Sequence, residues 1–165
     1  MPRSAGAVVT PVSTPQLDPT CSIAATLEAV GDRWTLLILR DLFRGVRRFE
    51  ALHRDLGIAR NLLTDRLHRL TELGMVHRVP YQDRPVRSEY RLTTKGADLS
   101  SALVALMRWG DRWYATDGPP TLLVHDACGT PLDQAVSCPS CDEFVTPHHI
   151  RSRPGPGRSG GKTHR

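Results

Sequence analysis

The sequence has few aromatic residues, almost no lysine and only four cysteines. Aromatic side chains make up 5% of the 165 residues, and 20 of the 22 basic residues are arginine. No apolar run approaches the roughly 18 residues of a membrane-spanning helix, so no membrane partner is expected. Residues 1–20 contain no continuous apolar stretch of the kind found in secretory leaders, which favours a cytoplasmic protein.

Sequence motifs of common catalytic sites are also missing. The sequence contains no glycine-rich phosphate loop, no Gly-x-Ser-x-Gly nucleophile elbow and no paired-carboxylate motif. We therefore expect a protein that is not an enzyme. In a reducing compartment, four cysteines are more typical of a metal site or of thiol chemistry than of a disulfide framework.

Positive charge is concentrated in one part of the chain. The formal net charge is +5, and residues 44–91 hold 11 arginines against six acidic residues. Residues 119–150, in contrast, hold four acidic residues and no lysine or arginine. A local basic excess of this kind indicates a polyanionic partner, and arginine suits forked contacts to phosphate and guanine.

Hydrophobic periodicity over residues 21–118 predicts a mainly helical domain with one small β-hairpin, an α+β fold. The first expected helix begins near Ser22 and ends at Gly31, and the second follows Asp32 and ends at Gly45. Three more are expected over about 47–56, 60–73 and 94–115. Asp32 and Thr94 are the expected N-caps of the second and last helices, because short polar side chains accept hydrogen bonds from a first helical turn. Gly57 is the expected left-handed residue after the third helix.

The third and fourth expected helices, joined by the turn at Gly57, form a helix-turn-helix. In this motif the second helix, here about 60–73, enters the major groove of double-stranded DNA with its N-terminal residues at the base edges. If Leu63, Leu67 and Leu70 face the core, the opposite side is polar and basic. The candidate DNA-contacting residues of this helix, for base edges and phosphates, are Arg60, Asn61, Thr64, Asp65, Arg66, His68 and Arg69.

The hairpin that follows would act as the wing of a winged helix-turn-helix. Its expected strands are 75–79 and 89–93, and its tip at 82–88 carries Arg84 and Arg87, which are placed to reach a neighbouring minor groove or backbone. These features together predict a DNA-binding transcriptional regulator. The alternative is a zinc-ribbon module that binds other proteins and has no sequence-specific DNA binding.

Motifs spread over residues 21–118 match the pattern of a known family. They are Cys21, 31–39, 49–52, Ile58, 63–67, Leu70, 74–76, Tyr81, 85–87, 89–90, 92–93, Gly96 and Trp109. On these motifs the chain resembles the HxlR-type winged helix-turn-helix transcriptional regulators. The resemblance implies a cytoplasmic bacterial regulator that binds operator DNA as a homodimer, with its first and last helices paired across the two-fold axis.

An apolar stripe on the expected last helix suits such a dimer interface, although an intramolecular core would have the same pattern. The stripe consists of Leu99, Leu103, Leu106, Trp109 and Trp113. In some members of the family a cysteine at the position of Cys21 senses oxidants or electrophiles, so Cys21 is a candidate redox sensor and an oxidant or small molecule a candidate inducer. A helix N-terminus favours the thiolate. The alternative is an inert cysteine that starts the first helix, and Ser22 stands where family members often have proline.

Residues 119–150 carry two short turns with the spacing of zinc ligands. Each turn separates two candidate ligands by two residues, and nine residues lie between the turns. Such turns place both side chains on one side of a loop, so two of them complete a tetrahedral Cys3His site. We expect a short zinc-ribbon-like segment with one structural zinc ion. The expected ligands are His125, Cys128, Cys138 and Cys141, with His148 and His149 as alternatives to His125.

Two other chemistries of these cysteines are disfavoured by their surroundings. A thioredoxin-like Cys-Pro-Ser-Cys site needs a βαβ unit, and only 24 residues follow Cys141. A zinc deaminase needs His-x-Glu, whereas Asp126 and Ala127 follow His125. The ends of the chain, 1–20 and the basic tail 151–165, are expected to be disordered.

Overall fold

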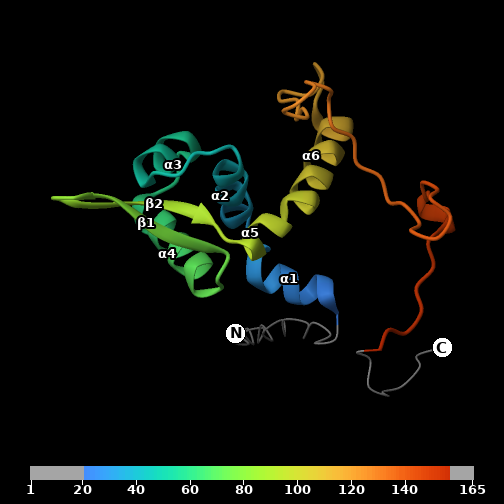
Figure 1. Ribbon diagram of the computed structural model, residues 1–165, viewed down its shortest axis with the longest axis horizontal. Helices are drawn as coiled ribbons and strands as arrows, with labels where there is room; N and C mark the ends of the chain where they lie inside the picture. The colour runs from blue at the N-terminus through green and yellow to red at the C-terminus, as the bar shows by residue number, and fades with distance from the viewer. Residues whose placement is uncertain (1–20, 157–165) are drawn as a thin grey trace, which may run out of the picture.

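The computed structural model describes residues 21–156, so the predictions for 1–20 and 157–165 lie outside the described residues. The described part begins with four helices, α1 (Ser22–Val30), α2 (Arg33–Phe43), α3 (Phe49–Leu56) and α4 (Arg60–Glu72). Next come the antiparallel strands β1 (Val76–Asp83) and β2 (Val86–Leu92), then α5 (Thr94–Asp98), α6 (Ser100–Tyr114) and the 3-10 turn η1 (Pro147–His149). In Figure 1 the hairpin projects from between α3 and α4. The C-terminal segment, residues 119–156, lies on the side of α6 that faces away from the hairpin.

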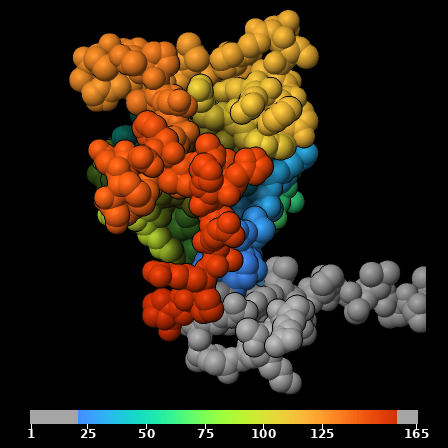
Figure 2. All heavy atoms as spheres, turned by 90° about the vertical axis from the view of Figure 1, so that its right-hand side faces the viewer, coloured from blue at the N-terminus to red at the C-terminus, as the bar shows by residue number. Residues whose placement is uncertain are grey.

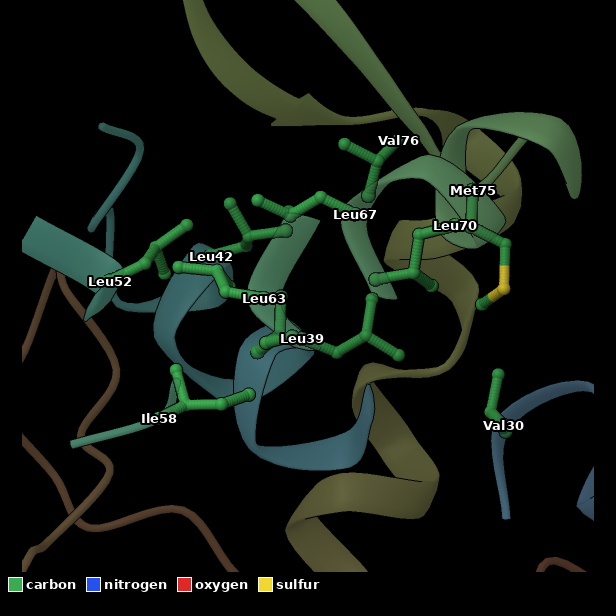
Figure 3. Close-up of a cluster of buried hydrophobic side chains, with 11 residues drawn as sticks. Val30, Leu39, Leu42, Leu52, Ile58, Leu63, Leu67, Leu70, Met75 and Val76 are labelled. Carbon is green, nitrogen blue, oxygen red and sulfur yellow. The ribbon is translucent and has the colours of Figure 1, made fainter. Parts of the chain in front are cut away.

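An apolar cluster at the junction of α2, α3 and α4 forms the core (Figure 3). Leu39 of α2, Leu52 of α3 and Leu63 of α4 are completely buried. Leu67 and Leu70 continue the buried side of α4. Burying one such side chain stabilises the fold by about 1.5–3 kcal/mol, so this cluster fixes the rotation of α4 about its own axis.

Local signals at two helix ends act as the sequence predicts. The Asp32 carboxylate accepts hydrogen bonds from the backbone N–H groups of Trp34 and Thr35, at 3.2 and 3.1 Å, and so caps α2. Gly57 has φ of 62° and ends α3 in the left-handed conformation that glycine adopts without steric cost. The turn between α3 and α4 is therefore encoded locally.

The last helix differs from the prediction of one helix over 94–115, because it is divided at Leu99 into α5 and α6. Its N-cap is Thr93 rather than Thr94, and the Thr93 hydroxyl accepts from the N–H of Gly96 at 3.2 Å. A β-carbon at Gly96 would lie 2.1 Å from the Met75 carbonyl oxygen. The N–H of Thr93 donates to the same carbonyl at 3.0 Å, so α5 begins against the residue that precedes β1.

The wing is longer than expected. The prediction placed the strands at 75–79 and 89–93, with 82–88 as the tip, whereas strand pairing continues to Asp83 and Val86. Only Arg84 and Pro85 form the turn, and the register shifts once between Pro80 and Gln82. Charged and proline residues obscured the alternating pattern on which the sequence prediction depended.

The apolar stripe of the last helix divides between two environments. Leu99 and Leu103 are partly buried and pack against the core. Leu106, Trp109 and Trp113 are exposed by 54%, 55% and 63%. The intramolecular core therefore uses only the first part of the stripe. None of the helices within 21–156 is long and apolar enough to cross a membrane.

Replacing Leu67 with alanine tests the role of the core. The substitution leaves a cavity under α4, so Leu67→Ala should lower the free energy of unfolding by about 2–5 kcal/mol. The neighbouring His68 is exposed, and His68→Ala should change it by less than about 0.5 kcal/mol. Denaturant unfolding followed by circular dichroism measures both values, and equal effects would contradict the assignment of the buried face.

Candidate nucleic-acid interface

The exposed side of α4 carries four of the predicted DNA-contacting residues. Asn61, Thr64, Asp65 and His68 are all exposed, on the side opposite the buried leucines. The Thr64 hydroxyl donates to the carbonyl of Arg60 at 2.9 Å, and His68 lies 3.5 Å from the Glu72 carboxylate. Asn61 stands in the first turn, where a recognition helix meets the base edges.

Arg60 is exposed but paired with α3. Its guanidinium donates to both carboxylate oxygens of Glu50 at 2.6–3.1 Å and lies 5.5 Å from the centre of the Phe49 ring. A forked pair of this kind has a defined geometry. Arg60 therefore joins the two helices of the motif, a role that sequence reasoning missed because Glu50 lies ten positions earlier in the chain.

Arg66 and Arg69, two of the predicted DNA-contacting residues, contact the protein itself. Arg66 is half-buried, and its Nε lies 3.0 Å from Asp32 Oδ1 at the start of α2. The Arg69 guanidinium donates to the backbone carbonyl of Glu28 in α1. Both side chains are thus engaged on the side of α4 that faces α1 and α2.

Asp32 is the electrostatic centre of that contact. Partial burial by itself raises the pKa of its carboxyl, because burial disfavours the charged form. Hydrogen bonds from the Thr35 hydroxyl at 2.5 Å, from the Thr35 N–H and from Arg66 outweigh this effect. The pKa of Asp32 in the folded protein is therefore lower than its ordinary value.

The wing presents arginines along its length. Arg84 in the turn and Arg87 in β2 are both exposed, as predicted. Sequence reasoning did not select Arg48, whose guanidinium lies 4.6 Å from the centre of the Tyr81 ring of β1. Arg48 also forms a β-bridge with Glu89 of β2. Residues just before α3 therefore pair with the wing. In the sequence, only the two adjacent basic residues Arg47 and Arg48 indicated that this segment could contribute to the basic surface.

Cys21, the predicted redox residue, is exposed at the N-cap of α1. Its carbonyl accepts a hydrogen bond from the N–H of Ala25 at 3.0 Å. This is the position at the start of the first helix that the sequence indicated.

The predicted zinc ligands form two separate pairs. His125 Nδ1 lies 3.2 Å from Cys128 Sγ, and Cys138 Sγ lies 3.1 Å from Cys141 Sγ. A hydrogen bond with Thr130 lowers the pKa of Cys128. The contact between the two thiols of the second pair lowers the pKa of Cys138 and raises the pKa of Cys141. Within 21–156, no three His, Cys, Asp or Glu side chains are grouped closely enough to hold a metal ion. The four-ligand zinc site therefore stays a prediction.

The alternative ligands are also separate from these pairs. His148 and His149 lie in η1, and the Nδ1 atom of His149 is 3.3 Å from the Thr146 hydroxyl.

Comparisons with known proteins agree with this geometry. The sequence profile of the HxlR-like helix-turn-helix family matches residues 29–117. The HTH-type transcriptional regulator Rv3095 of Mycobacterium tuberculosis is 50% identical over 137 residues, which cover 82% of this chain and 87% of that protein. The crystal structure of the transcription factor candidate PA1607 is 34% identical with a TM-score of 0.74, covering 82% of this chain and 95% of its own. The redox regulator HypR in its oxidized form is 30% identical with a TM-score of 0.52, covering 56% and 95%.

A helix-turn-helix with an exposed recognition helix and a basic wing defines a DNA-binding protein. The chain belongs to the HxlR-like helix-turn-helix family, and its function is DNA-binding transcriptional regulation. The alternative of a protein-binding module without DNA binding is not favoured. Rv3095 is described as a transcriptional regulator.

Acid titration tests the Asp32 contact. Because its pKa is lowered on folding, ionised Asp32 stabilises the folded state fully above the unfolded pKa of about 3.9, and this contribution is lost as the pH falls through the lower folded value. Asp32→Asn should therefore reduce the free energy of unfolding at pH 7, and the difference from the parent protein should shrink below about pH 4. Denaturant unfolding at several pH values measures it. A difference independent of pH would mean that Asp32 acts only as a neutral cap.

Proposed function

We propose that the chain binds operator DNA as a homodimer, with α4 in the major groove and the β1–β2 wing against the neighbouring minor groove or backbone. The main support for this proposal is that α4 has two different sides. Its leucine side is buried in the core, and its polar side is exposed in the first turns. Only one side of the helix is therefore available to DNA. Since DNA is the partner, we also propose a cytoplasmic location.

The contacts of each side chain support different roles on DNA. Asn61 is exposed in the first turn, so it is our principal candidate for a base contact, with Thr64, Asp65 and His68 around it. Arg84 and Arg87 extend from the wing and are assigned to phosphates. Arg60 can reach DNA only by sharing or leaving its pair with Glu50. Arg66 and Arg69, in contrast, are assigned to holding α4 in place.

Two exposed apolar helix faces support the homodimer. In α1, Ile23 and Leu27 are exposed by 71% and 54%, and α6 exposes Leu106, Trp109 and Trp113. A soluble protein rarely leaves so many large apolar groups in contact with water. Figure 2 shows α1, α6 and the C-terminal segment on one face of the molecule. We assign this face to contact with a second copy of the chain.

Redox sensing through Cys21 stays a prediction. The exposure of the thiol at the start of α1 supports it, because cysteines that react with oxidants are accessible to solvent. HypR, one of the similar structures, is a redox regulator.

Substitutions at DNA-contacting positions should separate base contacts from phosphate contacts. Asn61→Ala should weaken binding by about 1–3 kcal/mol and relax preference at one position of the site. Arg87→Ala should weaken binding to all sequences evenly and lower the salt dependence by about one phosphate contact. The control is Arg33→Ala in α2, where the exposed Arg33 stacks on Trp34. This substitution should change neither the sequence preference nor the salt dependence of binding.

The measurement combines selection of bound sequences from random DNA with salt titrations of the selected site. Equal, small losses for Asn61→Ala and Arg33→Ala would mean that α4 does not enter the groove as proposed. Retained specificity in Arg87→Ala, together with weaker binding, is the expected result for a wing residue.

A charge placed in the α6 stripe tests the dimer. Trp109→Glu should convert the protein to a monomer, because a carboxylate in an apolar interface loses its hydration without gaining a partner. The control is Val86→Glu in the wing, where the parent side chain is 75% exposed and outside the stripe. Sedimentation velocity should show a monomer for the first variant and a dimer for the second. If both variants were dimers, the interface would lie outside the α6 stripe.

A further inference from the structure

The first turn of the C-terminal segment has a defined backbone structure. The N–H of His125 donates to the carbonyl of Thr130 at 2.8 Å, and the carbonyl of His125 accepts from the N–H of Gly129 at 2.7 Å. Gly129 is left-handed, with φ of 70°. A β-bridge between Val124 and Pro131 closes the turn.

The second turn repeats these hydrogen bonds, the left-handed residue and the bridge thirteen positions later. The N–H of Cys138 donates to the carbonyl of Glu143 at 2.9 Å, and the carbonyl of Cys138 accepts from the N–H of Asp142 at 2.9 Å. Asp142 is left-handed with φ of 55°, which few residues other than glycine adopt. A bridge between Ser137 and Phe144 closes this turn. Two different sequences therefore build one backbone motif.

Each turn brings two metal-ligating side chains together. The nitrogen and sulfur of the first pair are 3.2 Å apart, and the sulfurs of the second pair are 3.1 Å apart. Neighbouring ligand atoms on a tetrahedral zinc ion lie about 3.5–3.8 Å apart, given Zn–S near 2.3 Å and Zn–N near 2.0–2.1 Å. Each turn therefore needs only a small side-chain adjustment to occupy two corners of a zinc tetrahedron.

Within one chain the two turns are held apart by the segment that joins them. Asp133 Oδ1 lies 3.2 Å from Arg108 Nη2, and the Gln134 side chain donates to the carbonyl of Ser101 at 2.8 Å. Asp133 and Gln134 of the joining segment 131–137 therefore contact α6 in its C-terminal half and in its first turn. Figure 1 shows the second turn well separated from the first, which lies near the C-terminal end of α6.

The second turn exposes large apolar side chains, as a surface that binds a partner does. Phe144 is exposed by 81% and Val136 by 60%. The C-terminal segment shares the face formed by α1 and α6, which is the face assigned above to a second copy of the chain (Figure 2). In a dimer with its two-fold axis through that face, each C-terminal segment would lie against the other protomer.

We infer that two zinc ions join the protomers of the homodimer, each bound by His125 and Cys128 of one chain and by Cys138 and Cys141 of its partner. The inference rests on the proposed homodimer. Three cysteines and one histidine fill all four tetrahedral positions, so these zinc ions are structural and leave no open position for a substrate. The C-terminal segment then acts as a clasp that holds the two DNA-binding domains together.

Two double variants test whether the site is shared between chains. His125→Ala/Cys128→Ser disables the first turn, and Cys138→Ser/Cys141→Ser disables the second. The parent dimer should hold two zinc ions, and each variant homodimer should hold none. A heterodimer of the two variants combines one intact first turn with one intact second turn from the other chain. It should therefore hold one zinc ion.

The two variants are produced together with different affinity tags that contain no histidine, and heterodimers are isolated through both tags. Zinc is measured by mass spectrometry of the metal, and sedimentation velocity gives the oligomeric state. Cys21→Ser is the matched control and should retain two zinc ions per dimer. Both double variants should keep the helical circular dichroism of the parent, because the buried core cluster lies wholly within residues 30–76.

A zinc-free parent dimer would overturn the inference and leave the proposed function intact. A heterodimer without zinc, from a parent that holds two ions, would place all four ligands of each site in a single chain and would also overturn it. A monomeric parent would instead refute the proposed homodimer, on which the inference rests.

Discussion

The packing of α4 through one row of leucines is the constraint on which the DNA-binding part depends. Leu63, Leu67 and Leu70 are spaced so that all three lie on one side of a helix, and each is almost completely buried. A helix held in this way cannot rotate without exposing them, so the opposite side is the one presented to solvent. The left-handed turn at Gly57 then sets the angle at which α3 meets α4. The exposure of the polar side of α4 is therefore a consequence of core packing.

The arginines of this region serve two purposes that the composition alone does not distinguish. Arg66 and Arg69 bind groups of the protein and hold α4 against α1 and α2, and Arg60 bridges to α3 through Glu50. Arg84 and Arg87 remain exposed in the wing. A net positive charge attracts DNA from a distance whichever arginine carries it. Only the arginines not committed to the fold are free for direct contacts.

The C-terminal segment has a different physical basis from the winged helix. Most of its large apolar side chains, including Leu122, Leu132 and Phe144, are exposed, so it has no core of its own. Short units of this kind are usually stabilised by a metal or by contact with another chain. Its order within one chain comes from two hydrogen-bonded turns and from contacts along α6. A shared metal site would supply both kinds of stabilisation at once.

By itself the sequence determined the features that depend on neighbouring residues. Helical periodicity, the Asp32 cap, the turn at Gly57 and the spacing of His125–Cys128 and Cys138–Cys141 are all local, and the structure contains each of them. The longer strands of the wing were not predicted, because they depend on cross-strand pairing. The division of the last helix at Leu99 was not predicted either. Tertiary structure also decided which arginines contact the protein itself and which are exposed in the wing. These properties depend on contacts between residues that are distant in the sequence, and a local sequence pattern does not predict such contacts.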